Sequence, residues 1–136
     1  MEEQMKSLDT NLNIYNREDF ENEIHVYCER RYQNRRIHQT TMKVIQDIPF
    51  MGKKVFIHLK VKRFKNDFDN TVNKKTITET FDFLNETGRR TKRLEEELYD
   101  LTKKQSFSAA SEYAEKYIAS ISRYTLVRMV VKKMKK

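Results

Sequence analysis

The sequence predicts an α+β protein, with a small β-rich N-terminal half followed by a three-helix unit of the helix-turn-helix type. Two patterns carry this prediction. Residues 54–64 alternate apolar and polar side chains with the period of a strand. From residue 91 onward the apolar residues recur at helical spacing. We therefore divide the 136 residues into an acidic flexible leader (1–19), a β-rich domain (20–86) and a helix-turn-helix domain (87–136).

Four stretches of the β-rich region have the composition of strands. Residues 24–28 alternate as a half-buried strand does, and residues 41–45 are rich in β-prone side chains. A Pro-Gly turn at 48–53 separates them from the strand at 54–64, and residues 76–81 predict a last short strand beyond a polar loop. In the clearest strand one face holds Val55, Ile57, Leu59 and Val61, and the other holds Lys54, Phe56, His58, Lys60 and Lys62.

Three short helices are predicted after the boundary at residues 88–90. Thr91 is suited to cap the first helix, in which leucines recur at i, i+4 and i+7. The second covers residues 107–117, and Ser122 is suited to cap the third. The apolar stripes consist of Leu94, Leu98, Leu101, Ala110, Tyr113, Ala114, Tyr117, Leu126, Met129 and Val130.

The third helix is the expected DNA-contacting element, because the last helix of a helix-turn-helix enters the major groove. An arginine can pair with a guanine edge through two hydrogen bonds, and threonine can contact a phosphate or a thymine methyl group. The alternative is a plain three-helix core with solvated arginines. The expected contact residues on this helix are Arg123, Tyr124, Thr125 and Arg128.

The strand at 54–64 is a second candidate surface, because its polar face is basic. Lysines at this spacing can follow a phosphate backbone, with Phe56 as a stacking platform for bases. The alternative is a sheet edge kept free of aggregation by lysines. The candidate residues are Lys54, Lys60, Lys62 and Arg63, and an equally ambiguous third cluster consists of Arg30, Arg31, Arg35 and Arg36.

The charge distribution favours a polyanionic partner. The chain has 28 Lys and Arg against 20 Asp and Glu, a net charge of +8. Residues 1–24 hold two basic and seven acidic residues, so the other 26 basic and 13 acidic residues give +13 behind a leader of −5. No apolar run is long enough to span a membrane, and the acidic start disfavours a secretory signal. The single cysteine fits a reducing compartment, so we expect a cytoplasmic protein.

Nothing in the sequence predicts catalysis or a cofactor. Cys28 is the only cysteine, and the His25-x-x-Cys28 spacing on a strand points the two side chains to opposite faces. No Ser-His-Asp set and no glycine-rich phosphate loop occurs. We therefore expect no catalytic residues, no bound metal and no enzymatic activity.

Three motifs, in the same order, resemble the N-terminal DNA-binding region of ISL-three family transposases. The first runs from His38 through Asp47-Ile48-Pro49-Phe50-Met51-Gly52-Lys53-Lys54-Val55 to Leu59-Lys60-Val61-Lys62-Arg63-Phe64. The others are Arg89-Arg90-Thr91-Lys92-Arg93-Leu94 and Ile121-Ser122-Arg123-Tyr124-Thr125-Leu126-Val127-Arg128. The resemblance covers about residues 22–135. It implies a zinc-finger-like β half and a helix-turn-helix, and it adds Arg89 and Arg90 to the expected DNA contacts.

The chain departs from this family at the metal site. Cys28 matches the first zinc cysteine, but Arg31 stands at the second, and Asn66 and Thr71 stand about where the later pair belongs. The β half is therefore expected to be a degenerate, zinc-free finger. Ile118 replaces the glycine of the helix-turn corner, and the chain stops where the catalytic domain would begin.

These observations predict a transposase-derived DNA-binding protein without catalytic activity, acting as a regulator or DNA-end binder of a mobile element or phage. The expected partner is double-stranded DNA, with self-association as a homodimer, no membrane, and a bacterial, nucleoid-associated location. One alternative is a protein–protein interaction module that keeps the fold. Another is a non-specific binder of single-stranded nucleic acid.

Overall fold

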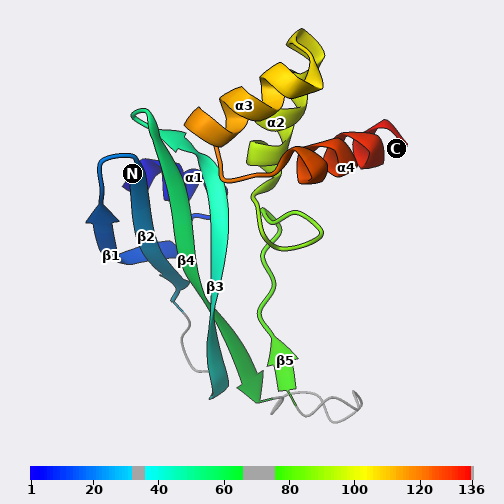
Figure 1. Ribbon diagram of the computed structural model, residues 1–136. Helices are drawn as coiled ribbons and strands as arrows, with labels where there is room; N and C mark the ends of the chain where they lie inside the picture. The colour runs from blue at the N-terminus through cyan, green and yellow to red at the C-terminus, as the bar shows by residue number, and fades with distance from the viewer. Residues whose placement is uncertain (32–35, 66–75, 136) are drawn as a thin grey trace.

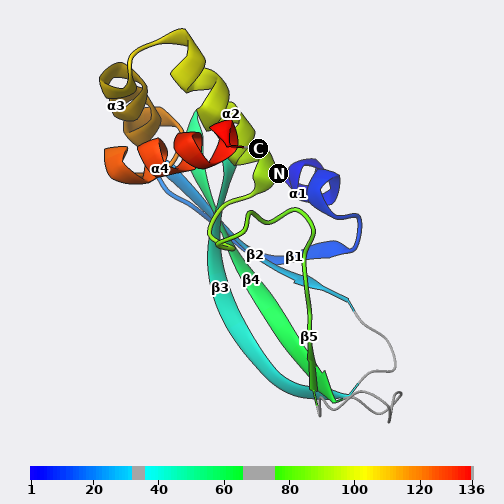
Figure 2. The same ribbon diagram turned by 90° about the vertical axis from the view of Figure 1, so that its right-hand side faces the viewer.

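The protein is described here from a computed structural model, which covers residues 1–31, 36–65 and 76–135. A twisted sheet occupies one end of the molecule and three C-terminal helices occupy the other (Figures 1 and 2). The elements are α1 (Glu2–Leu8), β1 (Leu12–Asp19), β2 (Glu23–Arg30), β3 (Ile37–Phe50), β4 (Lys53–Lys65), β5 (Thr76–Thr78), α2 (Lys92–Lys104), α3 (Phe107–Tyr117) and α4 (Arg123–Met134).

The strands form one mixed sheet in the order β1-β2-β4-β3, and β5 pairs with the end of β4. β3 and β4 are a long antiparallel hairpin, while β2 lies parallel to β4 on its other side. The hairpin closes through Met51 and Gly52, which have φ values of 50° and 77°. Positive φ at both central residues is what a type I′ turn requires, and this turn matches the twist of the strands.

The core lies on one face of the sheet and under α1. The alternation over residues 54–64 is confirmed from Val55 to Leu59, because Val55, Ile57 and Leu59 are buried beside the buried side chains of β2. It is wrong beyond that point, since Lys62 of the expected polar face is buried and Val61 is only partly buried. Met5 of α1 and Phe81 cover this cluster. A second apolar cluster fills the space between α2, α3 and α4, and its central side chains come from Leu94, Leu98, Ala110, Ala114, Leu126 and Met129.

The expected zinc-finger-like half is wrong. The β half is a single five-stranded sheet with an apolar core, and Cys28 belongs to that core beside Ile24 and Val26. Burial raises the pKa of the Cys28 thiol to about 12, which disfavours the thiolate that a metal would bind. The expected positions of the later cysteine pair, Asn66 and Thr71, lie outside the described residues.

The expected flexible leader also differs from the structure. Residues 1–19 form α1 and β1, and both elements contribute to the core through Met5 and Leu12. β1 pairs antiparallel with β2, but a β-bulge interrupts the register between Ile14 and Asn16. A bulge shifts the alternation of side chains by one residue, which hides the strand from a period-two pattern.

The C-terminal helices begin where the sequence predicts. Thr91, Ser106 and Ser122 each accept a hydrogen bond from the backbone N–H three residues ahead, which satisfies an otherwise unpaired donor. The fold class predicted from sequence is correct as α+β, but a separate helix-turn-helix is not confirmed. The α3–α4 connection is fastened to the sheet, since Gln46 of β3 donates to Ser120 O and accepts from Ser120 N.

Asp47 is fully buried at the junction of sheet and helices. Its Oδ1 accepts hydrogen bonds from Thr91 Oγ1 at 2.7 Å and Arg93 Nε at 2.9 Å. Its Oδ2 accepts from Arg93 Nη2 at 2.5 Å and from Gln4 Nε2 at 3.2 Å. One carboxylate therefore joins β3, the first turn of α2, and α1.

Replacement of this carboxylate tests its contribution to stability. Asp47→Ala leaves the Arg93 guanidinium without its buried partner, so we expect the free energy of unfolding to fall by about 3–5 kcal/mol. Urea denaturation of the full chain measures the change. Asp19→Ala is the control, because Asp19 pairs with Arg17 at the surface and its loss should have little effect. Equal losses in the two variants would contradict the role of Asp47.

The single thiol gives an independent test of the core. Because its pKa is about 12 and its side chain is buried, Cys28 should not react with a disulfide reagent at pH 8 in the folded protein. The same reagent should titrate one thiol after unfolding in urea. Rapid reaction of the native protein would show that β2 is not packed as described.

Candidate nucleic-acid interface

α4 presents a surface without a single carboxylate. Residues 123–134 contain no Asp or Glu, and Leu126, Met129 and Val130 turn one side of the helix into the core. The remaining side faces solvent and includes Tyr124, which is 71% exposed, and Arg128, whose guanidinium lies over the Tyr124 ring at 5.4 Å. The surface is therefore both cationic and aromatic.

A tight loop places two arginines beside α4. Asn85 accepts hydrogen bonds from the backbone N–H of Arg89 and of Arg90 through its Oδ1, at 3.1 and 3.2 Å. Gly88 closes the loop with φ +69°, and a Cβ there would meet Lys43 Nζ at 2.3 Å. The glycine thus lets the loop turn and lets a lysine of β3 approach it.

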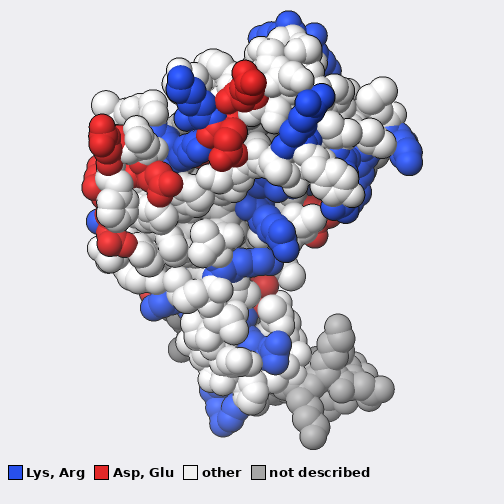
Figure 3. All heavy atoms as spheres, viewed as in Figure 1, with Lys and Arg blue, Asp and Glu red and all other residues white. Residues whose placement is uncertain are grey.

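The loop, the start of α2 and one side of α4 enclose a cleft of about 780 Å³. Its charged lining consists of Arg89, Arg90, Lys92, Arg128, Lys132 and Lys133, with Glu86, Glu95 and Glu96. Lys132 pairs with Glu86, and Lys133 pairs with Glu96. Six cations against three carboxylates leave the cleft positive. Lys and Arg predominate over α4 and the chain beneath it in Figure 3, whereas Asp and Glu gather at the β1 side.

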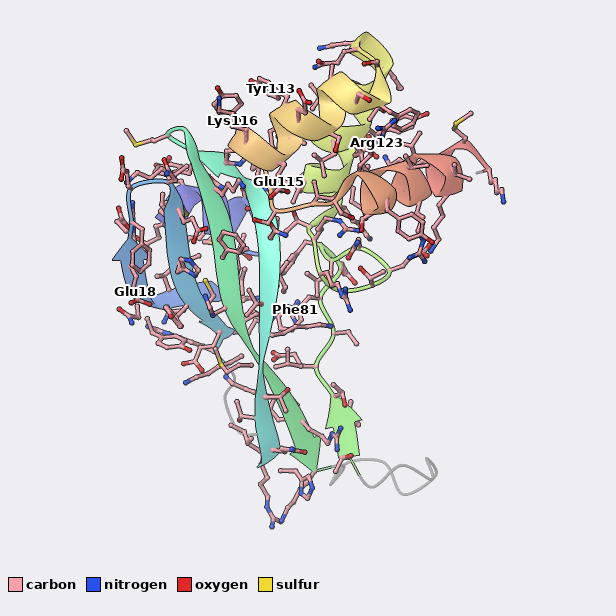
Figure 4. The ribbon with its side chains drawn as sticks, viewed as in Figure 1. Glu18, Phe81, Tyr113, Glu115, Lys116 and Arg123 are labelled. Carbon is pink, nitrogen blue, oxygen red and sulfur yellow. The ribbon has the colours of Figure 1, made fainter. Side chains whose placement is uncertain are left out.

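The structure brings together four of the residues that the sequence predicts as DNA contacts. Arg89 and Arg90 from the loop line the cleft with Thr125 and Arg128 from α4. Arg123 lies elsewhere, in a shallower hollow with Glu112 and Glu115 of α3. Figure 4 shows Arg123 and Glu115 on the α3 side of α4. Arg123 therefore faces a mixed-charge surface, whereas Thr125 and Arg128 of the same helix face the cationic cleft.

The basic strand does not extend this cleft, since none of its four predicted contacts is in the lining. Lys62 is 7% exposed and donates to Arg30 O at 2.6 Å, which differs from the expected surface contact. Lys60 lies 3.8 Å from a Glu29 oxygen and over the Tyr15 ring. Arg63 is exposed and Lys54 is half-buried.

Of the third basic cluster, Arg30 is held by Asp9 at 2.6 Å and lies over the ring of Phe81, which Figure 4 labels. Arg35 lies outside the described residues.

Sequence reasoning missed several residues of the cleft. Lys92 lies between predicted contacts in the chain, and Lys132 and Lys133 belong to the basic C-terminal run. The run is visible in the sequence, but its position against the loop depends on how α4 packs on α2. Asn85 carries a weaker signal, since an asparagine three residues before a glycine, as in Asn85-Glu86-Thr87-Gly88, is typical of a turn.

The outer face of the sheet carries an aromatic row rather than a stacking platform. Phe56 stacks on His25 with ring centroids 4.9 Å apart, and Tyr27 stacks on His58 at 4.4 Å. His25 Nδ1 and His58 Nε2 are hydrogen-bonded at 2.8 Å. Because one ring face of Phe56 already lies against His25, only the other ring face is left to stack on a nucleic-acid base.

The comparisons with known proteins do not place the chain in a family. No family model, curated protein or solved structure matches it. The resemblance to ISL-three family transposases therefore stays a prediction. Within the described part of the chain, no helix combines the length and apolar character needed to cross a membrane. No group of three or more His, Cys, Asp or Glu side chains in that part is placed to hold a metal ion.

The histidine pair predicts a pH dependence of stability. Burial and the neighbouring His25 lower the pKa of His58 below its ordinary value of 6.5. As the pH falls below about 6.5, the unfolded chain binds a proton at this residue more readily than the folded protein does, so stability decreases with acidity. The free energy of unfolding should therefore fall between pH 7.5 and 5.5, and less so in His58→Gln. An identical pH profile for both proteins would contradict this.

Proposed function

We propose that this protein binds double-stranded DNA through the solvent-exposed side of α4 and the loop at residues 85–90. The observation that carries the proposal is the acid-free surface of α4, next to Arg89 and Arg90 of that loop. A negatively charged ligand meets no carboxylate on this helix. An α-helix fits the width of the DNA major groove, and basic side chains beside it can contact the phosphates.

The side chains on α4 have the chemistry of base readout as well as of phosphate binding. Arg128 can pair with a guanine edge, and its contact with Tyr124 restricts how the guanidinium points. Thr125 Oγ1 and Ser122 Oγ lie 2.9 Å apart at the N-terminus of the helix. Together these groups suit a helix that reads a short sequence, with the loop arginines fixing its register on the backbone.

The motif resemblance supports a finer proposal. Arg89, Arg90 and Lys92 of one segment and Thr125 and Arg128 of the other line this surface. Both segments resemble parts of a transposase DNA-binding region. We therefore propose a non-catalytic DNA-binding protein of a mobile element or phage, acting as a regulator or as a binder of DNA ends.

One observation favours the second candidate, a protein-binding module. The outer face of the sheet exposes large apolar side chains that a DNA contact does not use, among them Phe20, Met42 and Val44. Exposed apolar patches of this kind are common at protein–protein contacts. Under this alternative, substitutions on the sheet face change partner binding and substitutions on α4 do not.

The DNA proposal is tested by selecting fragments from a random-sequence pool and measuring affinity by fluorescence anisotropy. Arg128→Gln should cost about 1–3 kcal/mol on the selected sequence and less on random DNA, because it removes a base contact. Arg17→Gln is the matched control, since it removes an exposed arginine from β1, outside the cleft, and should change neither value much. If the wild type enriches no sequence, or both variants lose affinity equally, base readout by α4 is wrong.

A further inference from the structure

Arg90 is the most unusual charged residue of the cleft. Only 9% of its surface is exposed, yet its Nε has no hydrogen-bond partner among the described residues. Its one ion pair is a single contact of 3.3 Å from Nη2 to Glu95 Oε1, and that oxygen also accepts a shorter bond of 2.6 Å from Asn85 Nδ2. The guanidinium is therefore largely removed from water but has too few hydrogen-bond acceptors around it.

The backbone holds Arg90 in this position. Its N–H donates to Asn85 Oδ1, and its carbonyl accepts from Asn85 N at 2.8 Å. The next residue, Thr91, caps α2 and is anchored to Asp47. Because both sides of the residue are fixed, the Arg90 backbone cannot move away from the cleft without breaking the loop.

Other cations around the same cleft are also unmatched. Arg89, Lys92 and Arg128 line it and make no ion pair with any described residue. They come from the loop, the first turn of α2 and the middle of α4, so their charges surround a common space. A phosphate group accepts hydrogen bonds from several directions and pairs with arginine through two parallel bonds. A buried guanidinium with an unused Nε fits such a group.

We propose that this cleft is a phosphate-binding site in which Arg90 is the buried anchor. The assignment deepens the proposed function and rests on it for the source of the phosphate, which would be the DNA backbone beside α4. A free phosphate compound offers the same chemistry from another source. In the absence of phosphate, Glu95 is the anion that partly satisfies Arg90. Phosphate binding replaces this contact, so Glu95 competes with the ligand.

The competition gives two variants with opposite effects. Arg90→Gln removes the anchor and should weaken phosphate binding about tenfold or more, as expected for the loss of a hydrogen-bonded charge. Glu95→Gln removes the competing carboxylate and should strengthen phosphate binding. The matched controls are Arg17→Gln on β1 and Glu112→Gln on α3, which make the same charge changes away from the cleft.

The experiment is a ¹H–¹⁵N NMR titration of the full chain with inorganic phosphate, at constant ionic strength set by sodium chloride. The Arg90 Nε–H signal should shift with phosphate and not with chloride alone, and the two controls should keep the wild-type Kd. If Arg90→Gln impairs folding, Lys92→Gln, at an exposed position, should still weaken binding. No phosphate-dependent shift, or equal effects of Glu95→Gln and Glu112→Gln, would overturn the site.

A parallel DNA titration separates the two sources. Loss of both phosphate and DNA affinity in Arg90→Gln, with phosphate competing for DNA, supports a backbone phosphate in the cleft. Loss of the phosphate response alone supports a free phosphate compound and leaves the proposed function intact. A phosphate response in a protein that binds no DNA keeps the site and refutes the proposed function. If the protein binds DNA but Arg90→Gln changes neither the phosphate affinity nor the DNA affinity, the phosphate site is wrong and the proposed function stands.

Discussion

The buried carboxylate of Asp47 is the constraint on which the arrangement of the molecule depends. Burying a charge is unfavourable unless it is paired and hydrogen-bonded, and here the cost is offset by contacts from α1 and α2. These contacts can form together only when the first turn of α2, the N-terminal helix and the end of β3 meet at one point. Asp47 thereby determines where the helices sit relative to the sheet, which apolar packing alone would specify less sharply.

The candidate site is a consequence of that arrangement. Arg90 directly precedes the cap of α2, and Arg89 O accepts a hydrogen bond from Gln46 N of β3. The same Gln46 holds Ser120, just before α4. Two neighbouring residues of one strand therefore fix both walls of the cleft.

The sequence was informative wherever local periodicity or capping determines structure. The alternation of β4 from Val55 to Leu59 and the caps at Thr91 and Ser122 could all be predicted, because each depends on residues close in the chain. The parallel pairing of β2 with β4 could not, since it joins strands separated by the whole of β3. The zinc-finger expectation failed for a related reason: Cys28 has the position of a ligand but the surroundings of a core residue. The basic residues of the cleft could be recognised as motifs in the sequence. That they lie around one cleft could not be predicted, because it depends on tertiary packing.

The pairing order of the sheet also has a consequence for how the chain folds. β3 and β4 are adjacent in sequence and joined by a two-residue turn, so their hairpin closes at a small entropic cost. β1 and β2 form a second local hairpin, whereas β2 and β4, which pair in parallel, are separated in sequence by residues 31–52. The two hairpins can therefore each close locally, but the sheet is complete only when the N-terminal hairpin pairs with β4. This parallel pairing is the non-local step in this half of the protein, so we expect it to form later than either hairpin.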